Sequence, residues 1–308
     1  MNMQRAALDT RACPACGQQA AALSLTVERA YRLWRCRSCR TEFFRPEDAD
    51  AAPRESAYWE PYKFSVYSSD AVLSEFERRY ERVVLEAEKA VGPIRSVLDI
   101  GCGIGNFLAY AGRRGIRAVG VDVEEKAVDS ARNRGLEACL PADVDARVPD
   151  SSLDAATMWD VIEHLLDPLE GLEAMVRKVR PGGALLFETP NAGFPPRRAV
   201  LSVHRITGRR VDLTDPFYYL EHRSYFTIEG MEALLRRCGC RITWSALAPS
   251  PRQKMARLFE MEGVEDPFKR ALSRAWPVLE STTNRIGMGN KLLVVAQRLP
   301  ADQAAAWT

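Results

Sequence analysis

Val97-Leu98-Asp99-Ile100-Gly101-Cys102-Gly103-Ile104-Gly105-Asn106-Phe107 is the stretch that decides the fold of this chain. The apolar run at 96–100 predicts a buried strand, and a helical pattern begins at Asn106, so the glycines lie in the turn between them. Glycine lets a backbone approach a ligand closely, and the first turn of a helix offers free N–H groups to it. A dinucleotide-binding fingerprint would need glycine where Asn106 stands, so this turn departs from that fingerprint.

A second acidic position follows the next predicted strand. The apolar run at 117–121 ends at Asp122, at about the separation from the glycine turn at which a carboxylate reaches a ribose diol. Asp122 could instead cap the helix that follows it, but its place directly after a strand favours the ribose role. The two features together therefore point to a ligand that carries a ribose.

Helical and apolar segments alternate along most of the chain. A helix from Ser69 ends at Gly92-Pro93. Strands are predicted at 94–100, 117–121, 136–140, 153–159, 184–189, 241–247 and 291–298, with helices at 106–114, 124–134, 168–179 and 227–238. This alternation predicts an α/β fold with a seven-stranded, doubly wound parallel sheet.

Composition excludes several classes of protein. With 308 residues, 46% of them hydrophobic, the chain is long enough for a full core and a second small module. A net charge of +2 gives no overall attraction to nucleic acid. No apolar stretch approaches the roughly 18 residues of a membrane span, and residues 1–11 lack the apolar core of a signal peptide, so we expect a cytoplasmic protein.

The cysteines fall into two groups. Two C-x-x-C pairs, Cys13 with Cys16 and Cys36 with Cys39, have the spacing of zinc knuckles, and the segment between them can form a hairpin. Residues 1–46 are therefore predicted to be a zinc ribbon, whose metal is structural because four thiolates leave no open coordination position. The remaining cysteines are interpreted as small buried apolar residues: Cys102, Cys139, Cys238 and Cys240.

Residues 47–92 are predicted to be a linker followed by the first long helix. Tyr58 and Tyr62 stand out in the linker. They either pack against the next domain or form a flap that closes over a bound cofactor. The sequence favours neither alternative.

Over residues 94–300 the chain resembles the class I S-adenosylmethionine-dependent methyltransferases. The resemblance rests on the glycine turn and on four later motifs: G-V-D-V at 120–123, D-V-I-E-H-L-L-D-P at 160–168, R-P-G-G-A-L-L-F-E-T-P-N at 180–191 and E-H-R-S-Y-F-T at 221–227. It implies a Rossmann-like methyltransferase domain at 93–300 with an antiparallel seventh strand. Insertions at 190–225 and 249–289 would form a lid and a cap.

The resemblance also implies S-adenosylmethionine as the cofactor. It places Gly101 and Gly103 against the methionine part, Asp122 on the ribose hydroxyls and Asp143 near the adenine amino group. Trp159, directly after the fourth strand, would lie near the transferred methyl group or the adenine. The remaining residues predicted to bind the cofactor are Asp99, Val123, Tyr58 and Tyr62.

Candidate catalytic residues follow the strand at 153–159. If they lie in a helix, Asp160, Glu163 and His164 share one face at the edge of the sheet where ligands bind. With His222 they would form a Mg²⁺ site or an acid–base pair for a poorly nucleophilic hydroxyl. The arrangement is similar to the E-x-x-E-H segment, with a later histidine, of metal-dependent small-RNA 2′-O-methyltransferases, and ubiquinone-pathway O-methyltransferases carry a related Glu-His segment. Asp160 stands where those sequences have glutamate, and the segment could also be an ordinary loop-to-helix signature.

The insertion at 190–225 contains a basic, amphipathic run. Its arginines could clamp a phosphate or carboxylate of the substrate, or they could belong to a solvated helix face. His204 lies within this run and is not expected in the site. The arginines are Arg197, Arg198, Arg205, Arg209 and Arg210.

These patterns favour a methyltransferase of a small-molecule acceptor such as a sugar, a phenol or a natural-product intermediate. Transfer to oxygen is slightly preferred, because Glu163, His164 and His222 can form a base or a metal site. Transfer to carbon is a close alternative, since a ribbon before a methyltransferase also resembles some sugar C-methyltransferases. An RNA methyltransferase is the less favoured alternative, because binding of single-stranded RNA requires more basic surface and more stacking aromatic residues than this sequence offers. A catalytically silent scaffold is disfavoured by the intact glycine turn, and the sequence predicts no oligomeric state.

Overall fold

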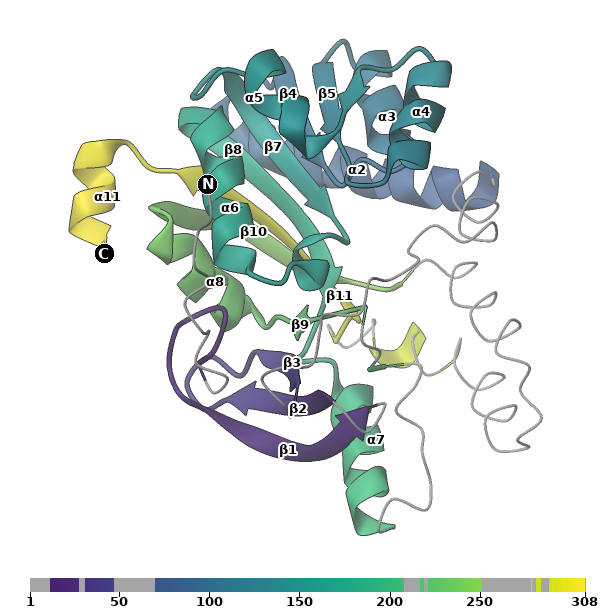
Figure 1. Cartoon of the computed structure of the whole chain (residues 1–308), viewed down its shortest axis with the longest axis vertical. Coiled ribbons are helices and arrows are strands. Elements are labelled where there is room, and N and C mark those ends of the chain that lie inside the picture. Colours follow the sequence, from purple (N-terminus) through teal and green to yellow (C-terminus); the bar gives the residue numbers. More distant parts are fainter. Residues whose placement is uncertain are drawn as a thin grey trace.

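The computed structural model describes residues 12–27, 31–46, 70–207, 217–218, 221–250, 278, 281–283 and 288–307. Within these ranges the chain forms a seven-stranded sheet covered by helices and a second, four-stranded sheet (Figure 1). The predicted seven-stranded α/β fold is confirmed. Tyr58, Tyr62 and most of the insertion at 249–289 lie outside the described residues.

The seven-stranded sheet has the strand order β10-β11-β8-β7-β4-β5-β6. Parallel pairing joins its central strands, which coincide with the predicted apolar runs: β4 (Ser96–Ile100), β5 (Arg117–Val121) and β7 (Leu153–Trp159). The flanking strands are β6 (Ala138–Cys139), β8 (Val179–Pro190), β10 (Cys240–Ala248) and β11 (Lys291–Arg298). β11 runs antiparallel to both β8 and β10, as expected for the last strand of this fold.

Helices cover both faces of this sheet (Figure 1). On one face, α2 (Asp70–Val91) packs beside α3 (Asn106–Arg113) and against β8 and β11. The other face carries α6 (Pro168–Lys178) and α8 (Ile228–Arg237), and α4 (Glu125–Asn133) contacts β6. Leu186 and Phe187 are adjacent in β8 and belong to the two opposite cores, because successive side chains of a strand point to opposite faces.

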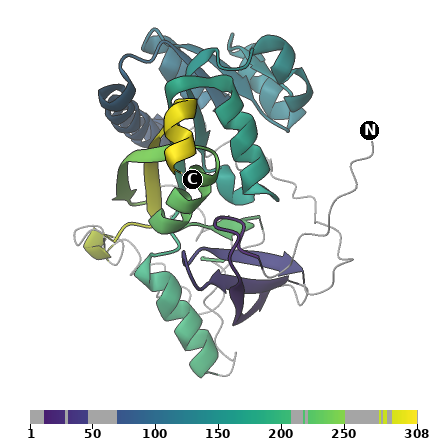
Figure 2. The same cartoon turned by 90° about the vertical axis from the view of Figure 1, so that its left-hand side faces the viewer.

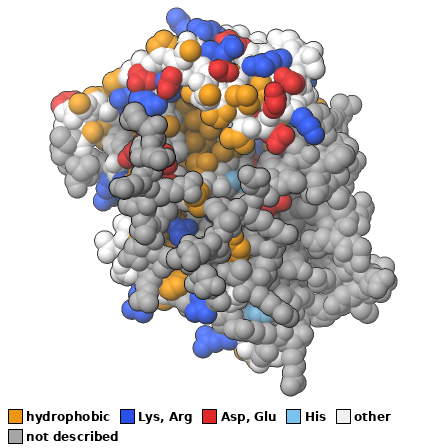
Figure 3. All heavy atoms as spheres, viewed as in Figure 1, with side chains coloured by type: hydrophobic (Ala, Val, Ile, Leu, Met, Phe, Trp, Pro, Cys, Tyr) orange, Lys and Arg blue, Asp and Glu red, His pale blue; other side chains and the backbone are white. Residues whose placement is uncertain are grey.

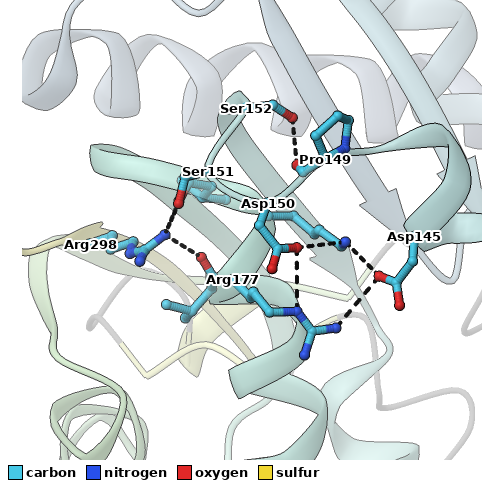
Figure 4. A network of polar contacts seen from close by, with 10 residues as sticks. Asp145, Pro149, Asp150, Ser151, Ser152, Arg177 and Arg298 are labelled. Atoms are coloured by element: carbon cyan, nitrogen blue, oxygen red, sulfur yellow. Dashed lines mark hydrogen bonds and ion pairs between the residues drawn. The ribbon is translucent and has the colours of Figure 1, made fainter.

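A network of charged side chains lies at the edge of the sheet where β7 begins (Figure 4). Lys178, at the end of α6, is buried, and its Nζ lies 2.5 Å from Asp145 and 2.8 Å from Asp150. These pairs connect the last turn of α6 to α5 (Val144–Arg147) through Asp145 and to the loop before β7 through Asp150. The network therefore stabilises the edge opposite to the one at which ligands bind in parallel sheets.

The second sheet joins the N-terminal segment to a distant part of the chain. Its strands are β1 (Ala20–Val27), β2 (Tyr31–Cys36), β3 (Glu42–Pro46) and β9 (Ser224–Tyr225), in that order. β1 and β2 form the predicted hairpin. Figure 2 shows this sheet below the seven-stranded sheet and beside α7 (Pro195–Ile206).

The described part of the insertion at 190–225 contains one helix and one short strand, α7 and β9. The apolar side of α7 and the aromatic residues near β9 pack on the N-terminal hairpin. In the sequence this segment reads only as a basic, amphipathic run, because the hairpin that covers its apolar side is far away along the chain. The cluster that joins them contains Leu25, Leu33, Phe44, Phe194, Val200 and Tyr225. None of the helices in the described ranges is long and apolar enough to cross a membrane.

Candidate functional site

The glycine turn connects β4 to α3 in a tight backbone geometry. The N–H groups of Gly101 and Cys102 both donate to the carbonyl of Val121, at 2.7 Å and 3.1 Å. Gly101 has a φ of +71°, and a Cβ at this position would lie 2.3 Å from Cγ2 of Val161. Only glycine therefore fits here, because a side chain would clash with the loop after β7 and strain the backbone.

Asp122 joins this turn to the start of α4. Its Oδ2 accepts a hydrogen bond from the N–H of Gly103 at 2.8 Å, and its Oδ1 accepts one from the N–H of Glu124 at 2.9 Å. The side chain is buried, and burial raises the pKa of its carboxyl despite these donors. Asp122 therefore links the glycine turn to the start of α4, and it lies directly after β5, the position on which the ribose prediction rests.

Asp99 lies deeper than the other predicted cofactor residues. It is 2% exposed and faces Thr157 across the β4–β7 pair, where Thr157 Oγ1 donates to Asp99 Oδ1 at 2.6 Å. Burial, assisted by the nearby charge of Asp122, raises the pKa of Asp99 to about 7. Its contact with a ligand would run through the glycine turn above it.

The other predicted cofactor residues follow the carboxyl ends of strands along the same edge. Val123, after β5, is 85% exposed, and Asp143 is exposed in a short 3-10 turn, η1 (Pro141–Asp143), after β6. Apolar side chains gather in the upper part of the face seen in Figure 3, where this sheet lies. The predicted residues are thus brought to one edge, where ligands bind in open α/β sheets.

Trp159 ends β7 and packs between two helices. Its ring centroid lies 4.7 Å from that of Tyr80 in α2 and 5.4 Å from that of Phe107 in α3. The indole Nε1 is buried and has no hydrogen-bond partner among the described residues. A buried N–H without a partner lowers the stability of the fold, so a ligand that accepts a hydrogen bond from Nε1 would gain binding free energy here.

Glu163 and His164 lie in a 3-10 turn, η2 (Ile162–His164), directly after β7. The side chain of Glu163 is fully buried, and Thr189 Oγ1 donates to its Oε2 at 3.0 Å. Its Oε1 has no hydrogen-bond partner in the described part of the chain. Burial and the charge of Asp160 raise the pKa of Glu163 to about 8, which favours the protonated carboxyl at pH 7.

The two histidines of the predicted site are in contact. The ring centroids of His164 and His222 lie 4.7 Å apart in an edge-to-face arrangement. Nδ1 of His164 lies 2.7 Å from the carbonyl oxygen of Glu221, to which it donates because a carbonyl only accepts. Burial, together with the nearby His164 and Lys291, holds the pKa of His222 well below its ordinary value of 6.5, so His222 is neutral.

The carboxylate of Asp160 does not join Glu163, His164 and His222 as a potential metal ligand, in contrast to the predicted shared helix face. Asp160 has a φ of +56°, and its carboxylate forms an ion pair with Lys291 of β11. This left-handed residue and the 3-10 turn replace the α-helical spacing on which the prediction depended. Glu163, His164 and His222 remain together, with one potential ligand atom of each within 4.8 Å of the others.

The four cysteines of the N-terminal pairs also converge. The sulfur atoms of Cys13 and Cys39 lie 3.6 Å apart, and those of Cys16 and Cys36 lie 3.4 Å apart. All four lie within 4.8 Å of one another and none forms a disulfide. The predicted cluster of four thiols therefore forms.

The arginines of α7 are divided between the core and the surface. Arg197 is buried, its Nη1 donates to the carbonyl of Phe217, and its guanidinium lies 4.2 Å from the ring centroid of Tyr225. Both contacts use the guanidinium of Arg197 within the fold. Arg198 and Arg205 are exposed, and Arg209 and Arg210 lie outside the described residues.

An ion pair that the sequence did not predict lies near this edge. Arg79 of α2 pairs with Glu188 of β8, and Arg79 Nη2 also donates to the carbonyl of Pro249 at 2.7 Å. The sequence does place Glu188 inside an apolar strand, which indicates that this carboxylate has a charged partner, since buried charges need partners. Its partner, 109 residues away, has no local signature.

Comparison with known proteins shows where the similarity lies. Residues 72–244 match the family model described as a methyltransferase domain. The chain is 34% identical over 129 residues to the ubiquinone biosynthesis O-methyltransferase of Hahella chejuensis (strain KCTC 2396), a match that covers 38% of this chain and 54% of that protein. The protein of the same name from Paracidovorax citrulli (strain AAC00-1) is 35% identical over 105 residues, or 32% of this chain and 44% of that protein. The chain thus spans about half the length of the curated relatives it matches.

A solved structure is also similar in fold. The crystal structure of a SAM dependent methyltransferase from Archaeoglobus fulgidus is 20% identical in sequence, with a TM-score of 0.49. The match covers 77% of this chain and 100% of that chain.

Proposed function

We propose, from the premise that this chain belongs to the methyltransferase domain family, that it transfers a methyl group from S-adenosylmethionine to a hydroxyl oxygen of a small-molecule acceptor. Two relatives named ubiquinone biosynthesis O-methyltransferase support oxygen as the methylated atom and a small molecule as its carrier. The remaining support comes from the groups at the carboxyl edge of the sheet.

The hydrogen bond between His164 and Glu221 is the observation that carries this proposal. It places the proton of the neutral imidazole on Nδ1 and leaves a lone pair on Nε2. A hydroxyl is a poor nucleophile at neutral pH, and a base in this state accepts its proton. His164 is only half-buried, whereas His222 and Glu163 are buried, so His164 is the residue that an acceptor reaches.

His222 and Glu163 support the proton transfer. When His164 takes the proton of the acceptor hydroxyl, its ring becomes positive. Neutral His222 adds no second positive charge, and a positive charge on His164 favours ionisation of the nearby Glu163, whose carboxylate then stabilises that charge. His164 therefore accepts the proton of the acceptor hydroxyl, and the other two residues influence the stability of its protonated form.

The residues at this edge fit S-adenosylmethionine. The unpartnered Nε1 of Trp159, the exposed Val123 and Asp143, and the carboxylate of Asp122 offer a donor, an apolar surface and acceptors along adjoining strands. When bound, the cofactor supplies an electrophilic methyl group on a sulfonium. The chain's contribution is to hold the acceptor oxygen in line with it, which supplies much of the acceleration in such transfers.

Glu163, His164 and His222 also fit a divalent cation. The Oε1 atom of Glu163 is buried without a partner among the described residues, and the hydrogen bond of His164 to a carbonyl is the support that ligating histidines commonly have. One carboxylate and two imidazoles suit a first-row transition ion better than Mg²⁺. We propose, as the alternative to a general base, that these three residues, without Asp160, would hold such a cation; the Nε2 lone pair of His164 would then bind the ion, and the ion in place of His164 would lower the pKa of an acceptor hydroxyl.

For the four-cysteine cluster we propose a structural Zn²⁺. Thiolates at about 2.3 Å from a tetrahedral zinc lie roughly 3.8 Å from one another. The Cys13–Cys39 and Cys16–Cys36 separations of 3.6 Å and 3.4 Å fit this geometry closely. Zinc would organise the knuckles and take no part in the methyl transfer.

The test is a transfer assay with S-adenosylmethionine that carries an isotopically labelled methyl group. Panels of phenols, sugars and single-stranded RNA serve as acceptors, first in chelator and then with Mn²⁺ or Mg²⁺. We expect the label on an oxygen of a small molecule, identified by mass spectrometry and NMR. Label on carbon, or on RNA alone, would overturn the proposal, and stimulation by Mn²⁺ above Mg²⁺ would support the three-residue cation site.

A further inference from the structure

The chain segment that carries His222 is attached to the four-cysteine module, here residues 12–46, at three successive places. Before His222, the hydroxyl of Tyr218 donates to Oε2 of Glu42 at 2.7 Å. Glu42 begins β3, is fully buried, and pairs with Arg35 of β2 at 3.2 Å. This first contact therefore ends inside the core of the module.

The second attachment is a backbone hydrogen bond at Arg223, the residue after His222. The N–H of Phe44 donates to the carbonyl of Arg223 at 2.9 Å. β3 then pairs with β9, with Glu42 opposite Tyr225 and Phe43 opposite Ser224. His222 thus lies one residue before a hydrogen bond to the module.

Beyond His222, the contact is with a cysteine of the cluster. Thr227 Oγ1 donates to the backbone carbonyl of Cys39 at 2.6 Å and accepts from the N–H of Gly230 at 3.0 Å. A Cβ at Gly230 would lie 2.1 Å from Oγ1 of Thr41, so α8 touches the knuckle at its first turn. The geometry of the cysteine knuckle and the start of α8 are therefore fixed together.

The opposite side of the same segment forms part of the proposed reaction centre. The carbonyl of Glu221 fixes the proton of His164, and the ring of His222 lies against both His164 and Tyr225, with centroids 4.7 Å and 5.4 Å apart. β3 is the strand that pairs with β9 in the second sheet, and beyond β9 the chain is joined to Asn191 by a single bridge at Phe226. β3 therefore makes the extended backbone contact nearest to Glu221 and His222.

We propose that the four-cysteine module is a positioning element for methyl transfer: through β3 and Cys39 it holds Glu221 and His222 against His164. This inference rests on the proposed function of His164. It assigns to the metal-binding module an effect on turnover without any contact between the metal and the reacting groups. The residues of the link, Glu42, Tyr218 and Thr227, are positioning residues.

The first test removes one hydroxyl from this link. Tyr218→Phe deletes the hydrogen bond to Glu42, and Tyr110→Phe, which deletes the equivalent bond from Tyr110 to Glu81 at 2.6 Å, is the matched control far from the module. For Tyr218→Phe we expect kcat to fall by about two- to tenfold, the effect of one hydrogen bond, and the affinity for S-adenosylmethionine to stay within twofold. Unchanged kcat and an unchanged pH–rate profile would overturn the inference, provided that the control also retains its activity.

Histidine NMR gives a readout that does not depend on turnover. The chain has three histidines, so ring nitrogen signals can be assigned with single substitutions. In Tyr218→Phe we expect the His222 signals to shift and His164 to lose part of its Nδ1–H form, whereas Tyr110→Phe should leave both unchanged. Signals of His164 and His222 identical to those of the wild type would contradict the inference.

Zinc removal from the whole protein is the second test. With a strong thiol-competitive chelator, we expect the His164 and His222 signals to broaden while S-adenosylmethionine still binds. If both signals persist after zinc loss, the module does not position the site. If the cofactor is lost as well, the module supports the whole fold and the inference is wrong. Failure of the zinc-loaded wild type to bind cofactor would instead refute the proposed function, so the two failures are distinguishable.

Discussion

His164 donates a hydrogen bond from Nδ1 to the backbone carbonyl of Glu221, 57 residues away, at 2.7 Å. This contact connects the turn after β7 to the segment that leads into β9. It sets the tautomer of the imidazole, because the nitrogen that faces a carbonyl must carry the proton. The proposed base therefore has a defined tautomer at the carboxyl edge of the seven-stranded sheet.

Substitution of this base should affect chemistry more than binding. For His164→Gln we expect kcat to fall by roughly 10²- to 10⁴-fold, the usual contribution of a general base. The affinity for S-adenosylmethionine, measured by calorimetry, should change by less than about twofold. His204→Gln is the control, since His204 lies on α7 and outside the cluster. A His164→Gln variant that loses cofactor binding and turnover in equal measure would show that the acceptor site has been misplaced.

Asp122 should contribute mainly to cofactor affinity. Asp122→Ala removes the acceptor of two backbone N–H groups and the carboxylate proposed for the ribose, so we expect affinity to fall by roughly 1–3 kcal/mol, or about 5- to 150-fold. Asp129→Ala, on the exposed surface of α4, removes a carboxylate of the same type at no proposed site. Equal affinities of the two variants in calorimetric titration would exclude Asp122 from the cofactor site.

The buried carboxyl of Asp99 should make stability depend on pH. In the folded chain its pKa is raised from 3.8 to about 7, so the native state keeps a proton that the unfolded chain releases between these values. The free energy of unfolding therefore falls as pH rises through this window, and the loss is complete above about pH 7. Asp99→Asn keeps a polar partner for Thr157 and removes the titration.

Denaturant unfolding at pH 4.5 and pH 8 measures this effect. We expect Asp99→Asn to gain roughly 2–4 kcal/mol relative to the wild type between about pH 4 and pH 7. Other titrating groups contribute equally to the free energy of unfolding of both proteins, so their contributions cancel in the difference. Parallel stability curves for the two proteins would mean that Asp99 ionises as readily in the folded as in the unfolded chain.

The cysteine cluster predicts a metal content. Wild-type protein should contain one zinc per chain, and a Cys13→Ser, Cys36→Ser double variant should lose it together with the fold of β1–β3, because metal binding organises such small modules. Cys238→Ser, which removes a cysteine outside the cluster, should keep the metal. Metal analysis and hydrogen exchange of the purified proteins provide the measurement. Zinc-free wild-type protein with a folded module would refute the metal assignment.

Much of the main sheet follows from local sequence. The strands at 117–121, 153–159 and 291–298 are apolar runs bounded by turns, and a pattern of this kind is complete within a few residues. The glycine turn and Asp122 likewise depend on neighbours in sequence. These features were therefore accessible without any knowledge of distant contacts.

The remaining features depend on contacts between distant residues. The pairing of β3 with β9 joins parts of the chain that carry no matching motif, and the charge partners of Asp160 and Glu188 lie on β11 and α2. Asp160 has a left-handed backbone where the residue spacing predicted a helix. Glu163, His164 and His222 were identified by residue type, but their relation to the module appears only in three dimensions.

Calorimetric titration of the zinc-loaded protein with S-adenosylmethionine and S-adenosylhomocysteine tests the central claim most directly. The account predicts that both ligands bind at a single site and that Asp122→Ala weakens both. If correctly folded, zinc-loaded wild-type protein bound neither ligand, the chain would be a methyltransferase fold without methyltransferase chemistry.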